Sequence, residues 1–259
     1  MNKSMAPEQG AYYYYQKIVE QERAKAEVRK TAIKLRRKNP IGIAGVIDVE
    51  TTGLNPSRDE VIELAIVLFS FERSTGRIIE RVEEYSSLRE PSIPIGEDAS
   101  RVNCISMSDV KGHRIDYKRI EELLDQCEFL VAHNAEFDRA FVENSIFVQV
   151  AGKKWYCSMR GINWRKQGSS SMSLQHLLKR YYIETGKAHR AIDDCRATLK
   201  LLSRCDKRNK PFLAKLLKNG PYEKDSKTHR QREISNSCLG CLVSFGAIII
   251  MFLFLRRCY

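Results

Sequence analysis

The stretch from Gly42 to Leu54 reads GIAGVIDVETTGL, and the rest of the chain is organised around it. An apolar run from Ile41 to Val49 predicts a buried strand that ends in two carboxylates, Asp48 and Glu50. Alternate side chains of a strand share a face, so the two carboxylates would point the same way, about 6–7 Å apart. Carboxylates that close repel each other unless cations lie between them, which favours a metal site. The stretch alone is equally consistent with a strand that ends in a solvated turn.

Basic residues are concentrated towards the two ends of the chain. The 259 residues carry a net charge of +12, of which residues 1–40 contribute +6 and residues 204–232 contribute +7. The centre, residues 41–203, is nearly neutral at −2. Basic flanks suit a polyanion, either nucleic acid or an anionic membrane surface, although solvated polar segments have the same composition. Eight cysteines without the paired spacing of a zinc site indicate a reducing compartment and no disulfide framework.

The order of predicted elements indicates the fold class. Besides the first strand, apolar runs predict strands at residues 61–71, 77–85, 128–132 and 153–157. The first two of these would form a hairpin. Helical patterns occur at residues 116–126, after Asn134, at 172–182 and at 190–203. Early strands followed by alternating strands and helices predict an α/β fold with a mixed sheet flanked by helices.

Extensions flank the predicted domain, which covers residues 41–205. Residues 1–40 are predicted to form a basic, helical arm that grips nucleic acid, or else a surface helix packed on the domain. Residues 206–237 are predicted to be a basic linker, and residues 238–259 a C-terminal anchor. The uncharged run at 239–255 has 17 residues and would span about 26 Å as a helix, close to what a bilayer requires. We therefore expect a cytoplasmic domain anchored to a membrane.

A second candidate site lies at the start of a predicted helix. The sequence VAHNAEFD, residues 131–138, joins a strand end to a first helical turn, where acids commonly occur because of the helix dipole. Phe137 is the centre of the buried stripe, and Glu136 and Asp138 each lie about 100° from it, on either side. Helix geometry therefore cannot choose between the two acids.

A third candidate site begins the last predicted helix, where residues 189–194 read HRAIDD. The apolar stripe of this helix includes Cys195. Asp194 lies about 100° from Cys195, at the edge of the stripe, whereas Asp193 lies about 160° away. The spacing therefore predicts that Asp194 reaches a site beside the sheet and that Asp193 faces water. A histidine such as His189, taken alone, is more often a surface residue.

Together, these three motifs resemble those of the DEDDh exonucleases, a superfamily that includes the proofreading subunit of bacterial DNA polymerase III and ribonuclease T. The matching residues occur in family order within residues 41–203: Asp48 and Glu50 in DVETTGL, Asp138 in HNAEFD, and His189 with Asp194 in HRAIDD. The resemblance implies a ribonuclease H-like fold and 3′-to-5′ exonuclease activity on single-stranded ends. We expect DNA to be the substrate. It also selects Asp138 over Glu136.

The resemblance further implies which residues approach the terminal nucleotide. These residues are Thr51, Thr52, Leu54 and Ile105. Ile105 lies in VNCIS, residues 102–106, where the family pattern is Val-His-Gly-Ile-Thr. The changes to Asn103 and Cys104 leave Ile105 as the residue expected to pack on a base and alter the rest of that pocket.

Phosphodiester hydrolysis suits this set of residues. Two divalent ions, Mg²⁺ or Mn²⁺, held by the four carboxylates would activate a water molecule and stabilise the leaving oxygen. His189 is expected to be the general base, because an imidazole can accept a proton near neutral pH. Two alternatives stay open: an exoribonuclease that trims 3′ ends, and a non-catalytic scaffold that binds nucleic acid or a membrane. Neither flank contains a recognisable polymerase-binding motif, so a polymerase partner is not identified.

Overall fold

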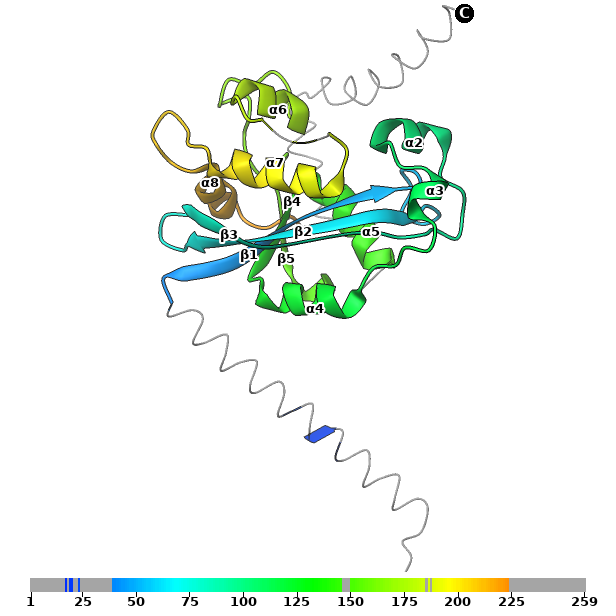
Figure 1. Ribbon diagram of the computed structural model, residues 1–259. Helices are drawn as coiled ribbons and strands as arrows, with labels where there is room; N and C mark the ends of the chain where they lie inside the picture. The colour runs from blue at the N-terminus through cyan, green and yellow to red at the C-terminus, as the bar shows by residue number, and fades with distance from the viewer. Residues whose placement is uncertain are drawn as a thin grey trace, which may run out of the picture. The chain divides into compact units, whose positions relative to one another are not determined.

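A five-stranded sheet forms the centre of the computed structural model, which describes residues 39–145, 150–184, 186 and 188–223, with Lys17, Val19, Glu20 and Arg23. The strand order is β3-β2-β1-β4-β5 (Figure 1). The strands are β1 (Ile41–Thr51), β2 (Val61–Glu72), β3 (Ile78–Leu88), β4 (Phe129–Ala132) and β5 (Lys154–Cys157). The first three are antiparallel neighbours, and β1, β4 and β5 run parallel. The predicted α/β class with a mixed sheet is confirmed, and the arrangement is consistent with a ribonuclease H-like fold.

Helices cover both faces of the sheet (Figure 1). One face carries α6 (Leu174–Arg180), α7 (Ala191–Ser203) and α8 (Phe212–Asn219). The other carries α4 (Tyr117–Gln126) and α5 (Ala135–Ser145), and a 3₁₀ turn, Val150–Gly152, precedes β5. Two short helices, α2 (Glu97–Asn103) and α3 (Met107–Val110), follow β3. Because both faces are covered, 11 of the 12 residues of β2 are buried.

Each face of the sheet has its own hydrophobic core, and β1 contributes to both. Ala44 and Val46 belong to the core beneath α7, whereas Ile47 and Val49 belong to the core beneath α4 and α5. Side chains alternate along a strand, so Asp48, two residues after Val46, lies on the α7 face. The packing of β1 therefore decides which helix the first acidic residue meets.

The folded domain extends past the predicted boundary at residue 205. The sequence predicts a basic linker at 206–237, but α8 lies within it, and its Phe212, Leu213 and Leu216 are 0% exposed. The linker prediction is wrong for residues 206–219, because the high density of lysine and arginine conceals a short apolar stripe. Part of the basic charge assigned to the C-terminal flank therefore belongs to the domain itself.

Other predictions concern residues outside those that the structure describes. The predicted anchor at 239–255, the rest of the linker and most of the arm at 1–40 lie there. Of the described residues of the arm, Lys17, Val19, Glu20 and Arg23 are helical, whereas Asn39 and Pro40 are not. Within the described part of the chain, no helix combines the length and the apolar character needed to cross a bilayer.

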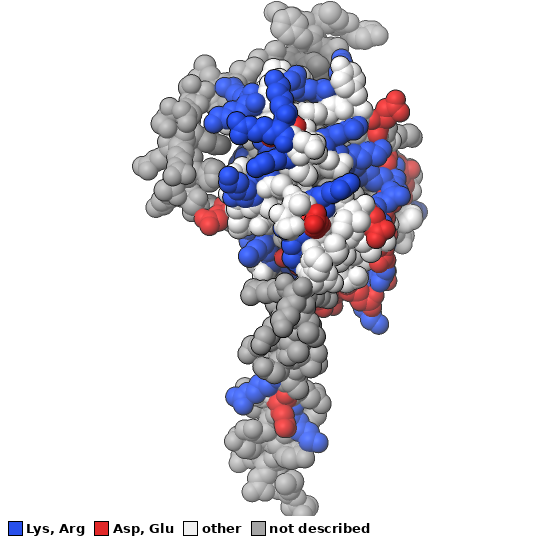
Figure 2. Space-filling view, turned by 90° about the vertical axis from the view of Figure 1, so that its left-hand side faces the viewer, with Lys and Arg blue, Asp and Glu red and all other residues white. Residues whose placement is uncertain are grey.

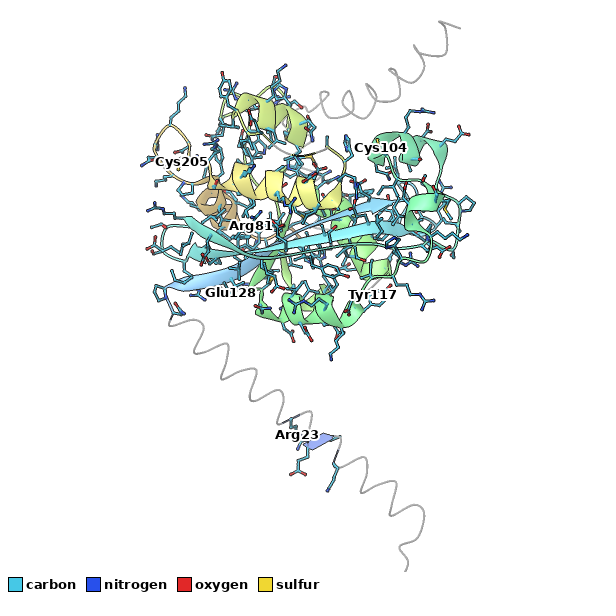
Figure 3. All side chains as sticks on the ribbon, viewed as in Figure 1. Arg23, Arg81, Cys104, Tyr117, Glu128 and Cys205 are labelled. Carbon is cyan, nitrogen blue, oxygen red and sulfur yellow. The ribbon has the colours of Figure 1, made fainter. Side chains whose placement is uncertain are left out.

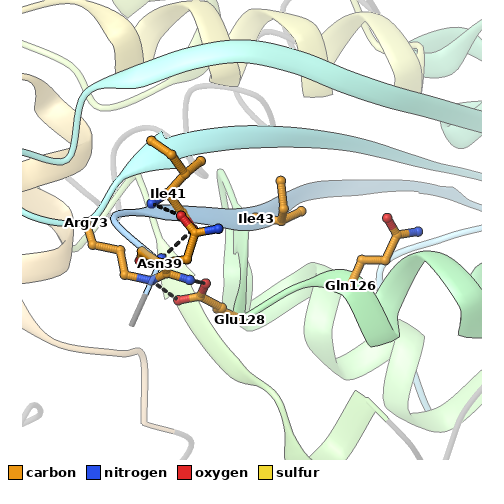
Figure 4. Close-up of a pocket in the computed structure, with 6 residues that line it drawn as sticks. All are labelled: Asn39, Ile41, Ile43, Arg73, Gln126 and Glu128. Atoms are coloured by element: carbon orange, nitrogen blue, oxygen red, sulfur yellow. Dashed lines mark hydrogen bonds and ion pairs between the residues drawn. The ribbon is translucent and has the colours of Figure 1, made fainter. Parts of the chain in front are cut away.

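Arg73 holds the beginning of β1 in place through hydrogen bonds and an ion pair (Figure 4). Its guanidinium donates to the carbonyls of Asn39 and Ile41 and pairs with Glu128, just before β4. A surface hollow is formed here, lined by Asn39, Ile41, Ile43, Arg73, Gln126 and Glu128. Ile41 is seven residues from Asp48, or about 23 Å along the strand, so this hollow is separate from the predicted metal site.

Candidate metal centre

Three carboxylates from two elements meet at one end of the sheet. Asp48 and Glu50 lie near the C-terminal end of β1, and Asp194 lies in the first turn of α7. Their ligand oxygens all lie within 4.8 Å of one another. The thiol of Cys195 donates to the carbonyls of Val46 and Ala65 at 3.5 Å, which holds α7 directly against the strands. The structure thus brings together the first and third predicted motifs.

Asp138 joins the cluster from α5. Its side chain is 3% exposed, and its Oδ1 accepts a hydrogen bond of 3.3 Å from the backbone N–H of Val49. Val49 is the residue between Asp48 and Glu50. Glu136 instead forms an ion pair with Arg160, and 55% of its side chain is exposed. Tertiary contact therefore separates the two acids that helix geometry could not.

The residues around Asp194 follow the predicted helical spacing. Asp193 turns away from the cluster and pairs with Arg196 at 3.2 Å. His189 has an exposed side chain, and its backbone N–H donates to Asp194 Oδ2 at 3.2 Å. Its φ of 59° lies in the left-handed region, which is uncommon for residues other than glycine. The structure places His189 next to a cluster carboxylate, and its catalytic role stays a prediction.

Burial and mutual repulsion raise the pKa values of the four carboxyl groups. Burial is the largest cause in each case; it brings the pKa of Glu50 to about 8, that of Asp138 to about 7 and that of Asp194 to about 6. The pKa of Asp48 is also raised well above its ordinary value, by burial and by the charge of Asp138. Without cations, the folded protein therefore disfavours the fully ionised form of the four carboxyl groups. Divalent cations would supply the missing positive charge, and a set of carboxylate oxygens fits Mg²⁺ or Mn²⁺.

Glu63 lies beside the cluster, although the sequence analysis did not select it. It pairs directly opposite Glu50 in the β1–β2 ladder and is 1% exposed. Its carboxylate accepts two hydrogen bonds of 3.0 Å from Arg190 and one of 3.1 Å from the backbone N–H of Ala191. These contacts clamp the start of α7 to β2 and so fix the position of Asp194. The sequence feature that could have identified Glu63 is its position as a single acid inside the otherwise apolar run VIELAIVLF.

The predicted substrate contacts after β1 form an ordered turn. Thr51 and Thr52 are 6% and 4% exposed. The Thr51 hydroxyl donates to the carbonyl of Gly53 at 2.5 Å, and the Thr52 hydroxyl accepts from the N–H of Glu60 at 2.9 Å. Leu54 is 75% exposed. The turn therefore holds its polar residues fixed and leaves one large apolar side chain in water.

Ile105 lies beneath the surface rather than on it. It is 2% exposed and packs with Ile62 and Val110, so its contact with a base stays a prediction. Asn103, at a position that departs from the family pattern, links the two segments. Its amide donates to the carbonyl of Thr51 at 3.4 Å, and its Oδ1 accepts from the N–H of Ile105 at 3.0 Å. Asn103, which stands where the family pattern has histidine, therefore has a structural role in this protein.

Comparisons with known proteins agree with this geometry. A family model described as exonuclease, of ribonuclease T type, matches residues 46–202. A PolC-type DNA polymerase III of Thermotoga petrophila is 29% identical in an alignment of 173 residues, and the match covers 61% of this chain and 11% of that protein. The PolC-type enzyme of Staphylococcus saprophyticus is 31% identical in an alignment of 166 residues, and the match covers 59% of this chain and 10% of that protein. The chain thus spans about a tenth of the length of these curated relatives.

Among solved structures, exonuclease I of E. coli illustrates the same fold. Exonuclease I of E. coli, in complex with a dA16 oligonucleotide, superposes with a TM-score of 0.51 at 21% identity. The match covers 67% of this chain and 42% of that chain. At this level of identity the likeness concerns the fold alone.

Proposed function

The chain belongs to the DEDDh exonuclease family of ribonuclease T type, and from this premise we propose that it removes nucleotides from single-stranded 3′ ends, preferentially those of DNA. The observation that carries the proposal is the cluster of Asp48, Glu50 and Asp194, whose ligand oxygens lie within 4.8 Å of one another. Asp138 is hydrogen-bonded to the backbone between the first two. Its PolC-type relatives are DNA polymerases, which supports DNA as the substrate.

In this proposal the four carboxylates hold two divalent ions, Mg²⁺ or Mn²⁺. When bound, the ions would act as Lewis acids towards the scissile phosphate. The protein holds the carboxylates in place before any ion arrives, because Asp48 and Glu50 are fixed by the β1–β2 ladder and Asp194 by the Glu63–Arg190 clamp. The raised pKa values of these groups support the need for cations at this position.

His189 is the proposed general base. Two observations support this role: the backbone N–H of His189 donates to Asp194, and the residue is exposed to water. An imidazole in that position can remove a proton from the attacking water. The exposed Leu54 and the fixed turn at Thr51 and Thr52 are the proposed contacts of the terminal nucleotide, since a 75% exposed leucine is available to pack on a base.

Substitution of His189 tests the proposed mechanism. The full-length His189→Ala variant should lose about 10²- to 10⁴-fold in turnover of a single-stranded oligonucleotide with Mg²⁺, because a general base typically contributes that much. Its melting temperature and Mn²⁺ binding should equal those of the wild type. His113→Ala, which removes another exposed histidine, is the matched control. A His189→Ala enzyme with wild-type turnover would refute the assignment.

The sugar preference needs a separate comparison. We expect faster degradation of a DNA oligonucleotide than of an RNA oligonucleotide of the same sequence, and none of either when a chelator is present. Faster degradation of RNA would identify an exoribonuclease instead. Binding of both oligonucleotides without degradation, in Mg²⁺ and in Mn²⁺, would identify a scaffold.

We also propose that residues 239–255 anchor the protein to a membrane, with the catalytic domain on the cytoplasmic side. The uncharged run of 17 residues supports this proposal. The full chain should be recovered with membranes and released by detergent. Recovery of the whole chain in the soluble fraction without detergent would contradict the anchor.

A further inference from the structure

Lysine and arginine side chains gather at one end of the domain, on the side of α8 and the loop before it (Figure 2). Figure 3 shows Cys205 at this end, whereas Cys104, beside α2, lies at the other end of the sheet. Three segments contribute exposed basic residues, and we name this surface the distal basic face: Lys166, Lys179, Arg180, Lys207, Arg208 and Lys210.

A cluster of aromatic rings brings the three segments together. Trp164, Tyr181 and Phe212 contact one another with ring centroids 5.0–6.1 Å apart. Each ring lies within two residues of a member of the distal basic face in the sequence. Trp164 and Phe212 are 1% and 0% exposed, so the cluster is part of the core. The three segments that carry the basic side chains are therefore held together by packing that does not involve those side chains.

The loop before α8 is also fixed from within. The carboxylate of Asp206 accepts hydrogen bonds from the backbone N–H groups of Arg208 and Lys210, at 2.8 and 2.9 Å. It also pairs with Lys215 at 2.7 Å. Asp206 thus shapes the loop, and the side chains of Lys207, Arg208 and Lys210 remain exposed around it.

The positive charge of the distal basic face is poorly neutralised. Residues 144–183 contain seven lysines and arginines and no aspartate or glutamate. Within the described residues, no member of the face has a carboxylate at salt-bridge distance. Because α8 and the loop before it belong to the domain, this charge is fixed on a folded surface rather than spread along a linker.

Tyr182 adds an aromatic ring next to this charge. It follows α6 with a φ of 52°, in a helix end where the N–H of Ile183 donates to the carbonyl of Leu178 at 2.9 Å. Glycine is the usual residue at this position of the motif, because other side chains are strained there. Tyr182 is 91% exposed, so burial does not compensate the strain. A protruding ring beside Lys179 and Arg180 is suited to stacking on a nucleic-acid base.

The distance to the metal centre matches the reach of a bound strand. The 13 residues of α7 run from the metal centre to this end of the domain, which is about 20 Å. Phosphates of one strand are spaced about 3.4 Å along a duplex, so a stacked strand whose 3′ end is at the metal centre reaches this end of the domain after about six nucleotides, and a more extended strand reaches it after fewer. A second contact of the same molecule gains from its high effective concentration.

We propose that the distal basic face is a second binding site for the nucleic-acid substrate, which holds the backbone about six nucleotides or fewer from the 3′ end. The proposal rests on the proposed exonuclease function. An anionic membrane carries the same charge, but a polynucleotide bound at the metal centre is already within reach of the face. The face therefore sets the affinity for long substrates and leaves the reaction at the 3′ end unchanged.

The test compares two double variants of the full chain. Lys207→Gln with Arg208→Gln changes the face, and Arg114→Gln with Lys118→Gln, which changes two exposed residues beside and within α4, is the control. At about 0.1 M salt, the first variant should raise KM about tenfold or more for a single-stranded DNA of about 25 nucleotides. Its kcat, and both constants for an oligonucleotide of about 3 nucleotides, which is too short to reach the face, should equal the wild-type values. The slope of log affinity against log salt should fall by about 2.

Each other outcome overturns the proposal. Wild-type KM for the long substrate, or an equal change for both lengths, would do so. Loss of binding to vesicles that contain phosphatidylserine, with unchanged affinity for the long oligonucleotide, would assign the face to a membrane. If the wild type degrades neither length, the proposed function fails instead, and binding of the long oligonucleotide, measured by fluorescence anisotropy, still decides the role of the face.

Tyr182→Gly should melt at a higher temperature and bind the long oligonucleotide more weakly, and a variant with unchanged binding would remove Tyr182 from the site.

Discussion

Two acidic residues of the metal centre each have another acidic residue close by in the sequence whose side chain forms an ion pair outside the centre. Asp194 belongs to the cluster while Asp193 pairs with Arg196, and Asp138 contacts β1 while Glu136 pairs with Arg160. The sequence predicts the first distinction, because the apolar stripe of α7 is well defined. Helical spacing cannot predict the second, because both acids flank Phe137 symmetrically. The resemblance to the family motif selects Asp138, and in the structure the contact with Val49 separates the two acids.

The two adjacent aspartates provide a direct test at this scale. Asp194→Asn should lower turnover about a hundredfold or more and weaken Mn²⁺ binding, because it removes a charged ligand from the cluster. Asp193→Asn, which alters a partly exposed side chain paired with Arg196, should keep turnover within about twofold of the wild type. Oligonucleotide degradation by the two variants measures the difference, and equal losses would contradict the assignment.

The raised pKa values predict how pH affects the protein without metal. The folded state keeps protons on Glu50, Asp138 and Asp194 up to about pH 8, 7 and 6, whereas the unfolded state releases them near pH 4. Between these limits the folded state binds more protons, so stability falls as pH rises. In a chelator, the free energy of unfolding should therefore be about 2 kcal/mol or more lower at pH 8 than at pH 5.

Divalent cations should remove most of this loss, because they neutralise the ionised carboxylates of the folded state. Urea unfolding at the two pH values, with chelator and with Mn²⁺, measures both effects. A metal-free protein that is more stable at pH 8 than at pH 5 would show that the cluster is not short of positive charge.

At the scale of elements, the clamp between β2 and α7 positions the third motif. The Glu63 side chain is 2% exposed and pairs with Arg190, whereas Glu84 is 21% exposed and pairs with Arg196. Arg190→Met should destabilise the fold by about 3 kcal/mol, because it leaves a buried charge unpaired. Arg196→Met should cost at most about 1 kcal/mol, as for a pair near the surface. Chemical denaturation of both variants tests this difference, and equal costs would exclude a special role for the clamp.

Periodicity explains which elements could be predicted. The long strands and the helices α4 and α7 have clear apolar patterns, so their positions follow from the sequence. The helices α2 and α3 have seven and four residues, too few for a pattern to emerge after the loop at Pro91 to Gly96. The clamp could not be predicted, because Glu63 and Arg190 are 127 residues apart in the chain.

At the scale of the whole molecule, the domain includes more of the C-terminal region than composition indicates. A charge count along the sequence assigns residues 204–232 to a basic flank, but three buried residues of α8 complete the core beneath α6 and α7. The same misassignment conceals the distal basic face, because charges that are scattered along the chain become neighbours only after the aromatic cluster forms.

The position of the boundary can be tested by shortening the chain. A chain that ends at Tyr222 should unfold cooperatively with the melting temperature of the full domain. A chain that ends at Cys205 should be strongly destabilised, because it lacks Phe212 and exposes Trp164; Phe212→Ala alone should cost about 3–5 kcal/mol. Thermal unfolding followed by circular dichroism compares them, and equal melting temperatures would place α8 outside the cooperative unit.

Exonuclease activity is decided by the degradation of a single-stranded DNA oligonucleotide labelled at its 5′ end. With Mg²⁺, the full-length protein should produce a ladder of labelled fragments that shorten from the 3′ end. A chelator should abolish the ladder, and so should Glu50→Gln, which keeps the shape of the side chain and removes one charge from the cluster. An oligonucleotide that stays intact in both Mg²⁺ and Mn²⁺, or a Glu50→Gln variant that degrades it at the wild-type rate, would contradict the account.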